Sequence, residues 1–524
     1  MNPFAILPPE LHMLVVQHLN HKSIVACSLV NRSWYQQFCP SVWESVTIKT
    51  SIQFEAFKTS VDCGALSCHG HLISTLKTDN YGVIELFVAS GAATCTNLTQ
   101  LYVAFKRLRK DSATGPIYMQ ALPLVCLLEN NPGLKSITLQ GSLVKRQIPL
   151  LQILSALPVG VEHLRLDGNT GWPQDDDDEK SPGVNEQDHA STIRAGDNGR
   201  QGDLPTLGLR KIELVGSVQG EVCVFETLRR SPLLEDLVFD DAMFYIYMGG
   251  EEELSDVLSK HCPALTSLYM DPGFVDDGFL SQLVDEASTQ GWRHLTFSGE
   301  GFGPLTEAAI MKHAGTLESL HLNIGLGFPS SAIQRLFCSA PNLKCFRGER
   351  PSLIYADVQL DASDMVQSQW VCHSLEKLQL CISGIPRPDL TTRTNNRPLT
   401  GPLHEGTSMG ASYKVQRQVY AQLGKLAKLR ELVLSVSLES ARQRNPDDFA
   451  DYEWETEGTY YDISLPQAEC QYECLSFTLE SGLDLLQDLK ELRVIELQDM
   501  AIGIDGEAEQ RWVKEHWPLV MLQT

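Results

Sequence analysis

One short phrase recurs along most of this sequence: an apolar residue, any two residues, a second apolar residue, any one residue and a third apolar residue. Alternation of this kind indicates a short strand with one buried face. Many successive copies start about 25 to 32 residues apart. The phrase begins at twelve positions: Leu98, Leu134, Val161, Leu209, Leu234, Leu265, Trp292, Leu317, Leu343, Leu375, Leu429 and Leu492. Strands repeated in this way predict an architecture in which each unit packs on its neighbours.

Segments with a helical period lie between these phrases, for example at residues 251–262, 277–288 and 331–340. In four copies a proline stands two residues before the first leucine. We expect it to end the preceding helix, because it lacks a backbone N–H and crowds the turn before it. These prolines are Pro132, Pro232, Pro263 and Pro341. A strand followed by an antiparallel helix, repeated, predicts a solenoid.

This pattern resembles the leucine-rich-repeat family, in its long form with a helix in each repeat. The resemblance implies an α/β fold with parallel strands on the concave face and helices on the convex face. The family's asparagine, three positions after the last strand leucine, occurs only at Asn169. Elsewhere that position holds Ser142, Ser217, Gly273, Gly325, Ser383 or Ser437. We therefore expect an irregular leucine-rich-repeat solenoid.

Three segments interrupt the period and are predicted to be loop insertions: residues 170–203, 384–412 and 439–473. The acidic run in the first is either a docking tag or a solvated loop. The third interleaves acids with Tyr452, Trp454, Tyr460 and Tyr461, which either pack on a solenoid edge or present a binding surface. Near the end, residues 507–520 predict a helix that caps the last apolar layer.

The stretch "LPPELHMLVVQHLNHKSIVACSLVNRSW", from Leu7 to Trp34, is unusually apolar for a chain with a formal net charge of −24. A first helix is predicted to carry Leu11, Leu14, Val15 and Leu19 on one stripe. After a break at "NHKS" we expect a second helix over residues 24–30, and then a short third helix with Trp34 and Phe38 that ends before Trp43. Three short helices rarely suffice to fold alone, so an apolar surface on them is expected to meet a partner.

The positions Leu7, Pro8, Glu10, Leu11, Leu19, Ile24, Cys27, Val30, Arg32, Trp34 and Trp43 stand at the spacing of the F-box motif, which this segment resembles. Asn31 departs from the motif where many members have Cys; it lies near a helix end, so we expect little consequence. The resemblance implies binding to the Skp adaptor, and through it to the cullin and RING subunits of an SCF ubiquitin ligase. The implied adaptor contacts are Leu7, Pro8, Glu10, Leu11, Val15, Leu19, Leu29 and Val30. Trp34 and Trp43 are expected to hold the helices together and seat them on the solenoid.

The predicted domains are thus an F-box at residues 1–45 and a solenoid at residues 46–524. Under this interpretation the protein is the substrate receptor of an SCF-type ligase, and the ligase chemistry is carried by other subunits. One alternative is that the helices only cap the repeats. Another is that the chain is an interaction scaffold with no ligase role.

Composition excludes several other classes of function. The acidic balance argues against general nucleic-acid binding, and no apolar run approaches the length of a membrane helix. The 14 cysteines are scattered, several inside apolar runs, which favours free thiols in a reduced compartment, the cytosol or the nucleus. The sequence has no nucleotide-binding, nucleophile-elbow or metalloprotease motif and no zinc-ligand spacing. We therefore predict no catalytic residue, cofactor or metal.

In the repeat phrase, the third, fifth and seventh positions are predicted to point to the concave face. We expect this face to bind a protein substrate, with Tyr269 as an aromatic anchor. The few basic residues are interspersed with acids, so the pattern does not indicate a phosphate-reading pocket. The predicted substrate-binding residues are His163, Arg165, Asp167, Lys211, Glu213, Asp236, Asp240, Tyr269, Asp271, His294, His321 and Asn323.

Overall fold

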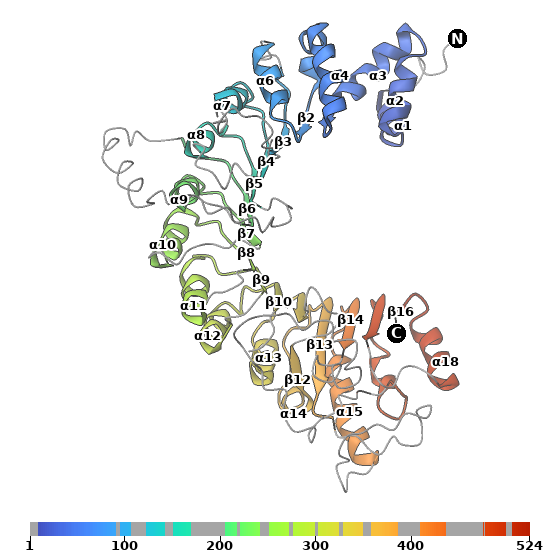
Figure 1. The fold of residues 1–524 in the computed structure, drawn as a ribbon. Coiled ribbons are helices and arrows are strands. Elements are labelled where there is room, and N and C mark those ends of the chain that lie inside the picture. The colour runs from blue at the N-terminus through green and yellow to red at the C-terminus, as the bar shows by residue number, and fades with distance from the viewer. Residues whose placement is uncertain are drawn as a thin grey trace, which may run out of the picture. The chain divides into compact units, whose positions relative to one another are not determined.

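The computed structural model describes residues 9–90, 95–105, 122–141, 150–168, 205–216, 221–240, 251–271, 276–298, 302–323, 328–348, 358–385, 409–435, 475, 477–498 and 506–523. The chain divides into two compact units, Met1–Leu265 and Thr266–Thr524. Each unit is built mainly of parallel strands joined by helices (Figure 1).

The first unit begins with three helices: α1 (Pro9–Gln17), α2 (His21–Ser28) and α3 (Arg32–Glu44). Asn20 starts α2 because its side chain accepts a hydrogen bond from the Ser23 amide at 2.9 Å. The expected break at "NHKS" is therefore shorter than predicted, and His21 already belongs to the helix. Asn31 starts α3 in the same way, accepting from the Trp34 amide at 3.0 Å. The third helix is also longer than expected and includes Trp43.

The strands of the first unit follow one another in chain order, and each pairs in parallel with the next. They are β1 (Ser45–Ile48), β2 (Thr75–Thr78), β3 (Gln100–Phe105), β4 (Ser136–Gly141), β5 (His163–Asp167), β6 (Lys211–Val215) and β7 (Asp236–Asp240). The helices after β1 are α4 (Ser51–Asp62), α5 (Ala65–His69), α6 (Gly82–Ala89), α7 (Leu122–Glu129), α8 (Leu150–Ser155), α9 (Glu221–Arg229) and α10 (Glu251–His261), with a 3₁₀ turn, η2 (Gly70–Leu72). Helices α6 to α10 lie along one face of the strands, and we call the other face the open face (Figure 1).

The second unit continues the same plan with parallel strands. They are β8 (Ser267–Asp271), β9 (His294–Ser298), β10 (Ser319–Asn323), β11 (Cys345–Gly348), β13 (Lys377–Ser383), β14 (Glu431–Ser435), β15 (Val494–Gln498) and β16 (Met521–Gln523). A short strand, β12 (Gln359–Asp361), pairs beside the end of β13. The helical elements are α11 (Asp277–Glu286), α12 (Pro304–Lys312), α13 (Ser330–Phe337), α14 (Ala362–Met365), α15 (Met409–Leu423), η4 (Leu483–Leu486) and α18 (Glu507–His516).

All twelve repeat phrases contain a strand, and the three predicted helical segments are α10, α11 and α13. The helices α7, α9, α10 and α13 end shortly before the four prolines, as predicted. The two units thus form the irregular leucine-rich-repeat architecture expected from the sequence.

Three local predictions were wrong. Residues 409–412 form the start of α15 instead of a loop, because Ser412 is buried and accepts a hydrogen bond from Gln416 Nε2 at 3.1 Å. The terminal helix stops at His516, before Pro518, and strand β16 follows it. Strand β2 escaped the pattern because its third inward position is Thr78, which is fully buried. The Thr78 hydroxyl accepts from the Asn80 amide and donates to the Asn80 carbonyl, each at 3.0 Å. The predicted insertion 170–203, nearly all of 384–412 and all of 439–473 lie outside the described residues.

The leucines of the phrase form the core. In β5, for example, Leu164 and Leu166 are both 1% exposed. Trp292 takes the first position of its repeat and is fully buried. Its indole N–H donates to the carbonyl of Val284 at 2.7 Å, so that the larger ring introduces no unsatisfied donor.

Within each unit, a backbone joint links neighbouring repeats. In the first unit, the amides of Glu162 and His163 both donate to the carbonyl of Lys135, at 2.9 and 3.0 Å. In the second unit, the amides of Glu318 and Ser319 donate in the same way to the carbonyl of Arg293, at 2.8 and 2.9 Å. The accepting residue is always the second of its phrase, so this position has the same surroundings in successive repeats.

Over part of each unit, the side chains at this second position alternate in charge. In the first unit they are Lys135, Glu162, Arg210 and Glu235; in the second they are Arg293, Glu318, Lys344, Glu376 and Arg430. Thr99 and Thr266 are uncharged, and Arg493 repeats the charge of Arg430. We call each row a charge ladder. Lys135 Nζ lies 2.7 Å from Glu162 Oε1, and Arg430 Nη1 lies 3.2 Å from Glu376 Oε2. Lys344 lowers the pKa of Glu318 by hydrogen bonding to it. The ladders therefore support the same strand order as the backbone joints.

Replacing Glu318 by Lys should lower the stability of the protein, because it places three cations in a row with Arg293 and Lys344. We expect a loss of about 1 kcal/mol at low salt, since these groups are close to solvent, and a smaller loss at high salt. Thermal unfolding, monitored by circular dichroism at low and at high salt, measures the two losses. Glu515→Lys, an equal charge change on the exposed side of α18, is the control. Equal losses in the two variants would contradict a role for the ladder.

Candidate functional site

Large apolar side chains are exposed on the three N-terminal helices. Leu29 is 78% exposed, Val30 59%, Leu14 51% and Leu11 47%. Leu11 and Leu14 lie three residues apart on α1, whereas Leu29 and Val30 follow α2 directly. Burying one such side chain fully stabilises a complex by about 1.5–3 kcal/mol, so this set has the character of a protein-binding surface.

The predicted adaptor contacts are distributed unevenly over this surface. Of them, Leu11, Leu29 and Val30 are exposed, whereas Val15 and Leu19 are half-buried. Leu7, Pro8 and the side chain of Glu10 lie outside the described residues. Leu14 is exposed as well but was not among the predicted contacts, although its spacing of three from Leu11 placed it on the same helical stripe.

His69, at the end of α5, joins the three helices to the repeats. The ring of Trp43 stacks on the His69 ring with centroids 5.2 Å apart. Tyr35 Oη lies 3.1 Å from His69 Nε2, and Cys39 Sγ lies 3.7 Å from His69 Nδ1. Burial lowers the pKa of His69, so the neutral ring is favoured in this junction. Trp43 therefore seats the helices as predicted, whereas Trp34 packs against Phe38 of its own helix at 5.6 Å.

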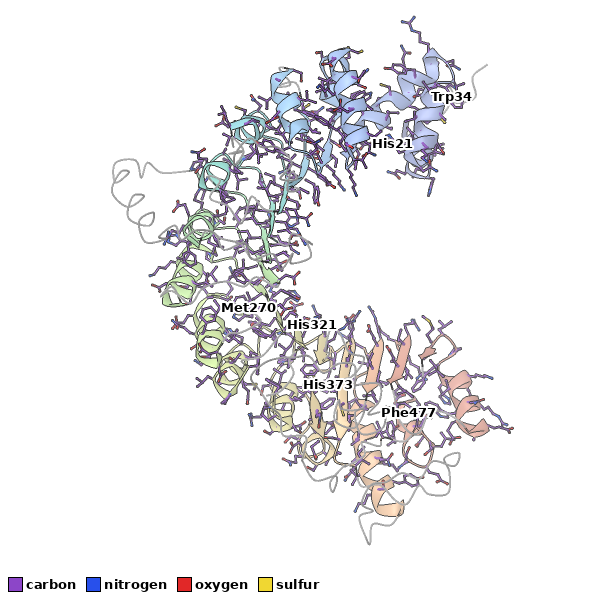
Figure 2. All side chains as sticks on the ribbon, in the orientation of Figure 1. His21, Trp34, Met270, His321, His373 and Phe477 are labelled. Carbon is purple, nitrogen blue, oxygen red and sulfur yellow. The ribbon has the colours of Figure 1, made fainter. Side chains whose placement is uncertain are left out.

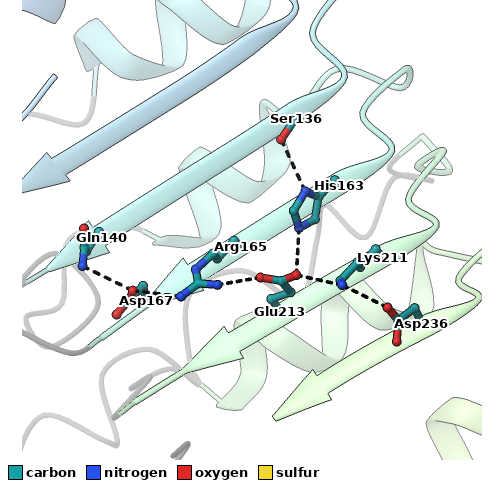
Figure 3. Close-up of polar contacts among 8 residues, drawn as sticks. All are labelled: Ser136, Gln140, His163, Arg165, Asp167, Lys211, Glu213 and Asp236. Carbon is teal, nitrogen blue, oxygen red and sulfur yellow. Dashed lines mark hydrogen bonds and ion pairs between the residues drawn. The ribbon is translucent and has the colours of Figure 1, made fainter. Parts of the chain in front are cut away.

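On the open face of the first unit, eight polar side chains form one connected network across β4 to β7 (Figure 3). Six of the eight were predicted substrate contacts; Ser136 and Gln140 were not. The network consists of Ser136, Gln140, His163, Arg165, Asp167, Lys211, Glu213 and Asp236.

Glu213 is the centre of this network. It lies 2.8 Å from Arg165 Nη1 and 2.9 Å from Lys211 Nζ. Burial alone would raise the pKa of Glu213, but hydrogen bonds from Lys211 and Arg165 lower it below its ordinary value. Arg165 also lies 3.4 Å from Asp167, and Lys211 lies 3.1 Å from Asp236. Two strong cations thus face three carboxylates, and each cation contacts two of them.

The uncharged members extend the network to β4. Gln140 Nε2 donates to Asp167 Oδ2 at 3.3 Å, and Ser136 Oγ lies 3.4 Å from His163 Nδ1. His163 Nε2 lies 3.4 Å from Glu213. Asp167 is only 6% exposed, so its side chain is part of the framework and is less accessible than predicted.

The open face of the second unit carries Tyr269, Asp271, His294 and His321 as predicted; the side chain of Asn323 lies outside the described residues. Tyr269 is half-buried, so the predicted anchor has only part of its ring in contact with solvent. His321, labelled in Figure 2, lies 3.2 Å from Ser319 Oγ and 3.3 Å from Cys345 Sγ.

Two cationic side chains lie beside His321. Arg347 Nη2 and Lys377 Nζ each lie 3.0 Å from an oxygen of Glu431. Lys377 and Glu431 occupy the third position of their phrases, so the pattern placed them on this face. Arg347 was missed because its phrase, "LKCFRG", has Gly348 where other repeats have an apolar residue. These charged residues belong with His321 in one cluster.

The described residues offer no sign of a metal or membrane site. No group of three or more His, Cys, Asp or Glu side chains among them is placed to hold a metal ion. The described helices are all too short or too polar to cross a membrane. The described cysteines are free thiols, of which Cys126 and Cys338 are half-buried.

The family model described as F-box-like matches residues 4–49, which include α1, α2, α3 and β1. This segment is an F-box-like domain. No curated protein matches the chain. Among solved structures, the crystal structure of the Rad7 and Elc1 complex in yeast is similar, with 12% identity and a TM-score of 0.39 over 90% of this chain and 95% of that chain.

His321 should make the protein's stability depend on pH. Burial, Arg347, His294 and Lys377 together lower its pKa from 6.5 to about 4. Because the unfolded chain then binds a proton that the folded chain does not, stability falls as the pH drops from about 6.5 to about 4. The loss from this residue is up to about 3 kcal/mol.

The test compares urea unfolding of the protein and of His321→Gln at about pH 7 and about pH 4.5. Besides the cations named, the thiol of Cys345 faces this ring. The variant should lose less stability on acidification than the unchanged protein. Equal losses would show that His321 titrates normally in the fold.

Proposed function

We propose that this protein is the substrate-recognition subunit of an SCF-type ubiquitin ligase. The F-box-like domain binds the Skp adaptor, which connects it to the cullin and RING subunits, and the leucine-rich repeats bind a protein substrate. The observation that carries this proposal is the exposed apolar set Leu11, Leu14, Leu29 and Val30 on the F-box-like helices. A monomer gains nothing from these four exposed side chains, whereas an adaptor groove would bury them.

The repeats support the second half of the proposal. Their open face presents polar and charged side chains from successive strands, a surface suited to reading a protein segment along its length. In this role the chain needs no catalytic group of its own, because the conjugating chemistry belongs to the RING-bound enzyme. Free thiols support the expected location in the cytosol or nucleus.

Leu29→Asp should strongly weaken binding of the Skp adaptor, because a carboxylate would replace the most exposed leucine of the apolar set. We expect affinity to fall by about 2 kcal/mol or more, which is about 30-fold. Co-purification and calorimetric titration with the adaptor measure the effect. Ile52→Asp is the matched control, since Ile52 is 81% exposed on α4, just outside residues 4–49.

Each outcome separates the proposal from its alternatives. Absence of adaptor binding by the unchanged protein would show that these helices only cap the repeats, and equal binding by the Leu29 and Ile52 variants would exclude Leu29 from the adaptor contact. Adaptor binding without cullin in the same complex, and without ubiquitylation of any captured partner, would identify a scaffold instead of a ligase receptor.

A further inference from the structure

The open face of the second unit carries an excess of cationic and imidazole groups over four successive strands. His294 lies on β9, His321 on β10, Arg347 on β11 and Lys377 on β13. The registers place His294, Ser319, Cys345 and Lys377 in one row across the sheet, and they place His321 and Arg347 in the next row. No Asp or Glu occurs within these four strands. The whole chain has a net charge of −24, so such a patch is unusual for it.

One carboxylate serves both strong cations of this patch. Glu431 comes from the next strand, β14, and each of its oxygens is 3.0 Å from one cation: Oε1 from Arg347 and Oε2 from Lys377. Arg347 keeps unused capacity, because its Nε is buried and has no hydrogen-bond partner. A guanidinium presents five donors in a fixed plane, and that plane matches the two oxygens of a carboxylate or phosphate.

The network of the first unit provides a contrast within the same protein. There, Arg165 and Lys211 face Glu213, Asp167 and Asp236, so carboxylates outnumber strong cations. In the second unit the ratio is reversed, with two cations for Glu431. An incoming anion would therefore meet a positive charge that no carboxylate neutralises only on the second patch.

We propose that the patch formed by His294, His321, Arg347 and Lys377 binds an oxyanion carried on a side chain of the protein substrate, either a phosphoryl group or a carboxylate. Glu431 holds Arg347 and Lys377 in place when no ligand is bound, and the ligand competes with it. This inference names the substrate chemistry of the repeats and thus rests on the proposed function. It also replaces the sequence-based expectation that basic residues on this face are balanced by interspersed acids.

The shape of the patch supports a side chain as the source of the anion. Neighbouring strands lie about 4.8 Å apart, so the patch extends over roughly 14 Å from β9 to β13, wide enough for one extended peptide segment. The cluster is half-buried at His321, Cys345 and Arg347, whereas His294 and Lys377 are exposed. A peptide can thus approach from the open side and place one anionic side chain against Arg347.

The test measures binding of three labelled peptide pools to the full chain in complex with the Skp adaptor, by fluorescence anisotropy. The pools have the same random flanks and differ only at the central residue, which is phosphoserine, glutamate or serine. We expect the phosphoserine pool, the glutamate pool or both to bind about tenfold or more tightly than the serine pool. The preferred pool identifies the oxyanion, and its advantage should shrink as ionic strength rises.

Three variants locate the site. Arg347→Gln and Lys377→Gln should each remove most of the advantage of the anionic pool. Glu431→Gln should increase it about threefold or more, because it removes the internal competitor but keeps a hydrogen-bonding side chain. Lys260→Gln, which removes an exposed cation paired with Asp256 on α10, on the helical face and not on the open face, is the control and should change nothing. Circular dichroism and thermal unfolding confirm that each variant is folded.

Three results would overturn the inference: equal binding of all three pools, an equal loss in the Lys260 and Arg347 variants, or no gain in the Glu431 variant. Adaptor binding is measured in parallel on the same samples. If the adaptor binds and the pools are not distinguished, the oxyanion site fails while the receptor function stands. If the free chain distinguishes the pools but does not bind the adaptor, the receptor function fails and the site stands.

Discussion

In most repeat phrases of both units, the carbonyl of the second residue accepts two amides from the repeat that follows, and the arrangement within each unit depends on this joint. It fixes the register of each strand against the next, so that the inward residues stack in rows: Leu164 beside Ile212, and Leu320 beside Phe346. A slip of one residue would turn the leucines outward and the charged residues inward. The alternating charges at the same second position favour this register too, because opposite charges meet only when consecutive repeats are neighbours.

The joint also explains how this fold tolerates long interruptions. Arg165 and Glu213 are 48 residues apart in sequence, and Arg347 and Glu431 are 84 apart, yet both pairs meet on adjacent or nearby strands. The entropic cost of closing a loop grows only slowly with its length, so an added segment between two repeats disturbs their pairing little. The open face is therefore assembled from residues that no local sequence motif connects.

Much of the fold follows from the sequence because the leucine pattern reports burial directly. The pattern predicted the strand of every phrase, and the F-box spacing predicted the three N-terminal helices. The leucine pattern failed where another residue type occupies a buried position that a leucine fills in other repeats. Thr78 is buried with its hydroxyl satisfied by Asn80, which hid β2. At Gly348, a Cβ atom would lie 2.4 Å from the Cβ of Val358, so Val358 takes the space of the missing side chain.

The candidate surfaces were predictable to different degrees, because one is set by a local motif and the other by contacts between repeats. Exposure of Leu29 and Val30 follows from a local motif. The contacts of Gln140 with Asp167 and of Glu431 with Arg347 join different repeats, so they could be predicted only from the strand order. The two kinds of surface also differ in what a ligand must displace in order to bind. The apolar set on the F-box-like helices has no partner to lose and gains from any burial, whereas the charges of the open face already contact one another. A ligand there must replace an existing ion pair with a more favourable one. This requirement favours partners whose charges match the open face in sign and spacing over partners that bind only through apolar contacts.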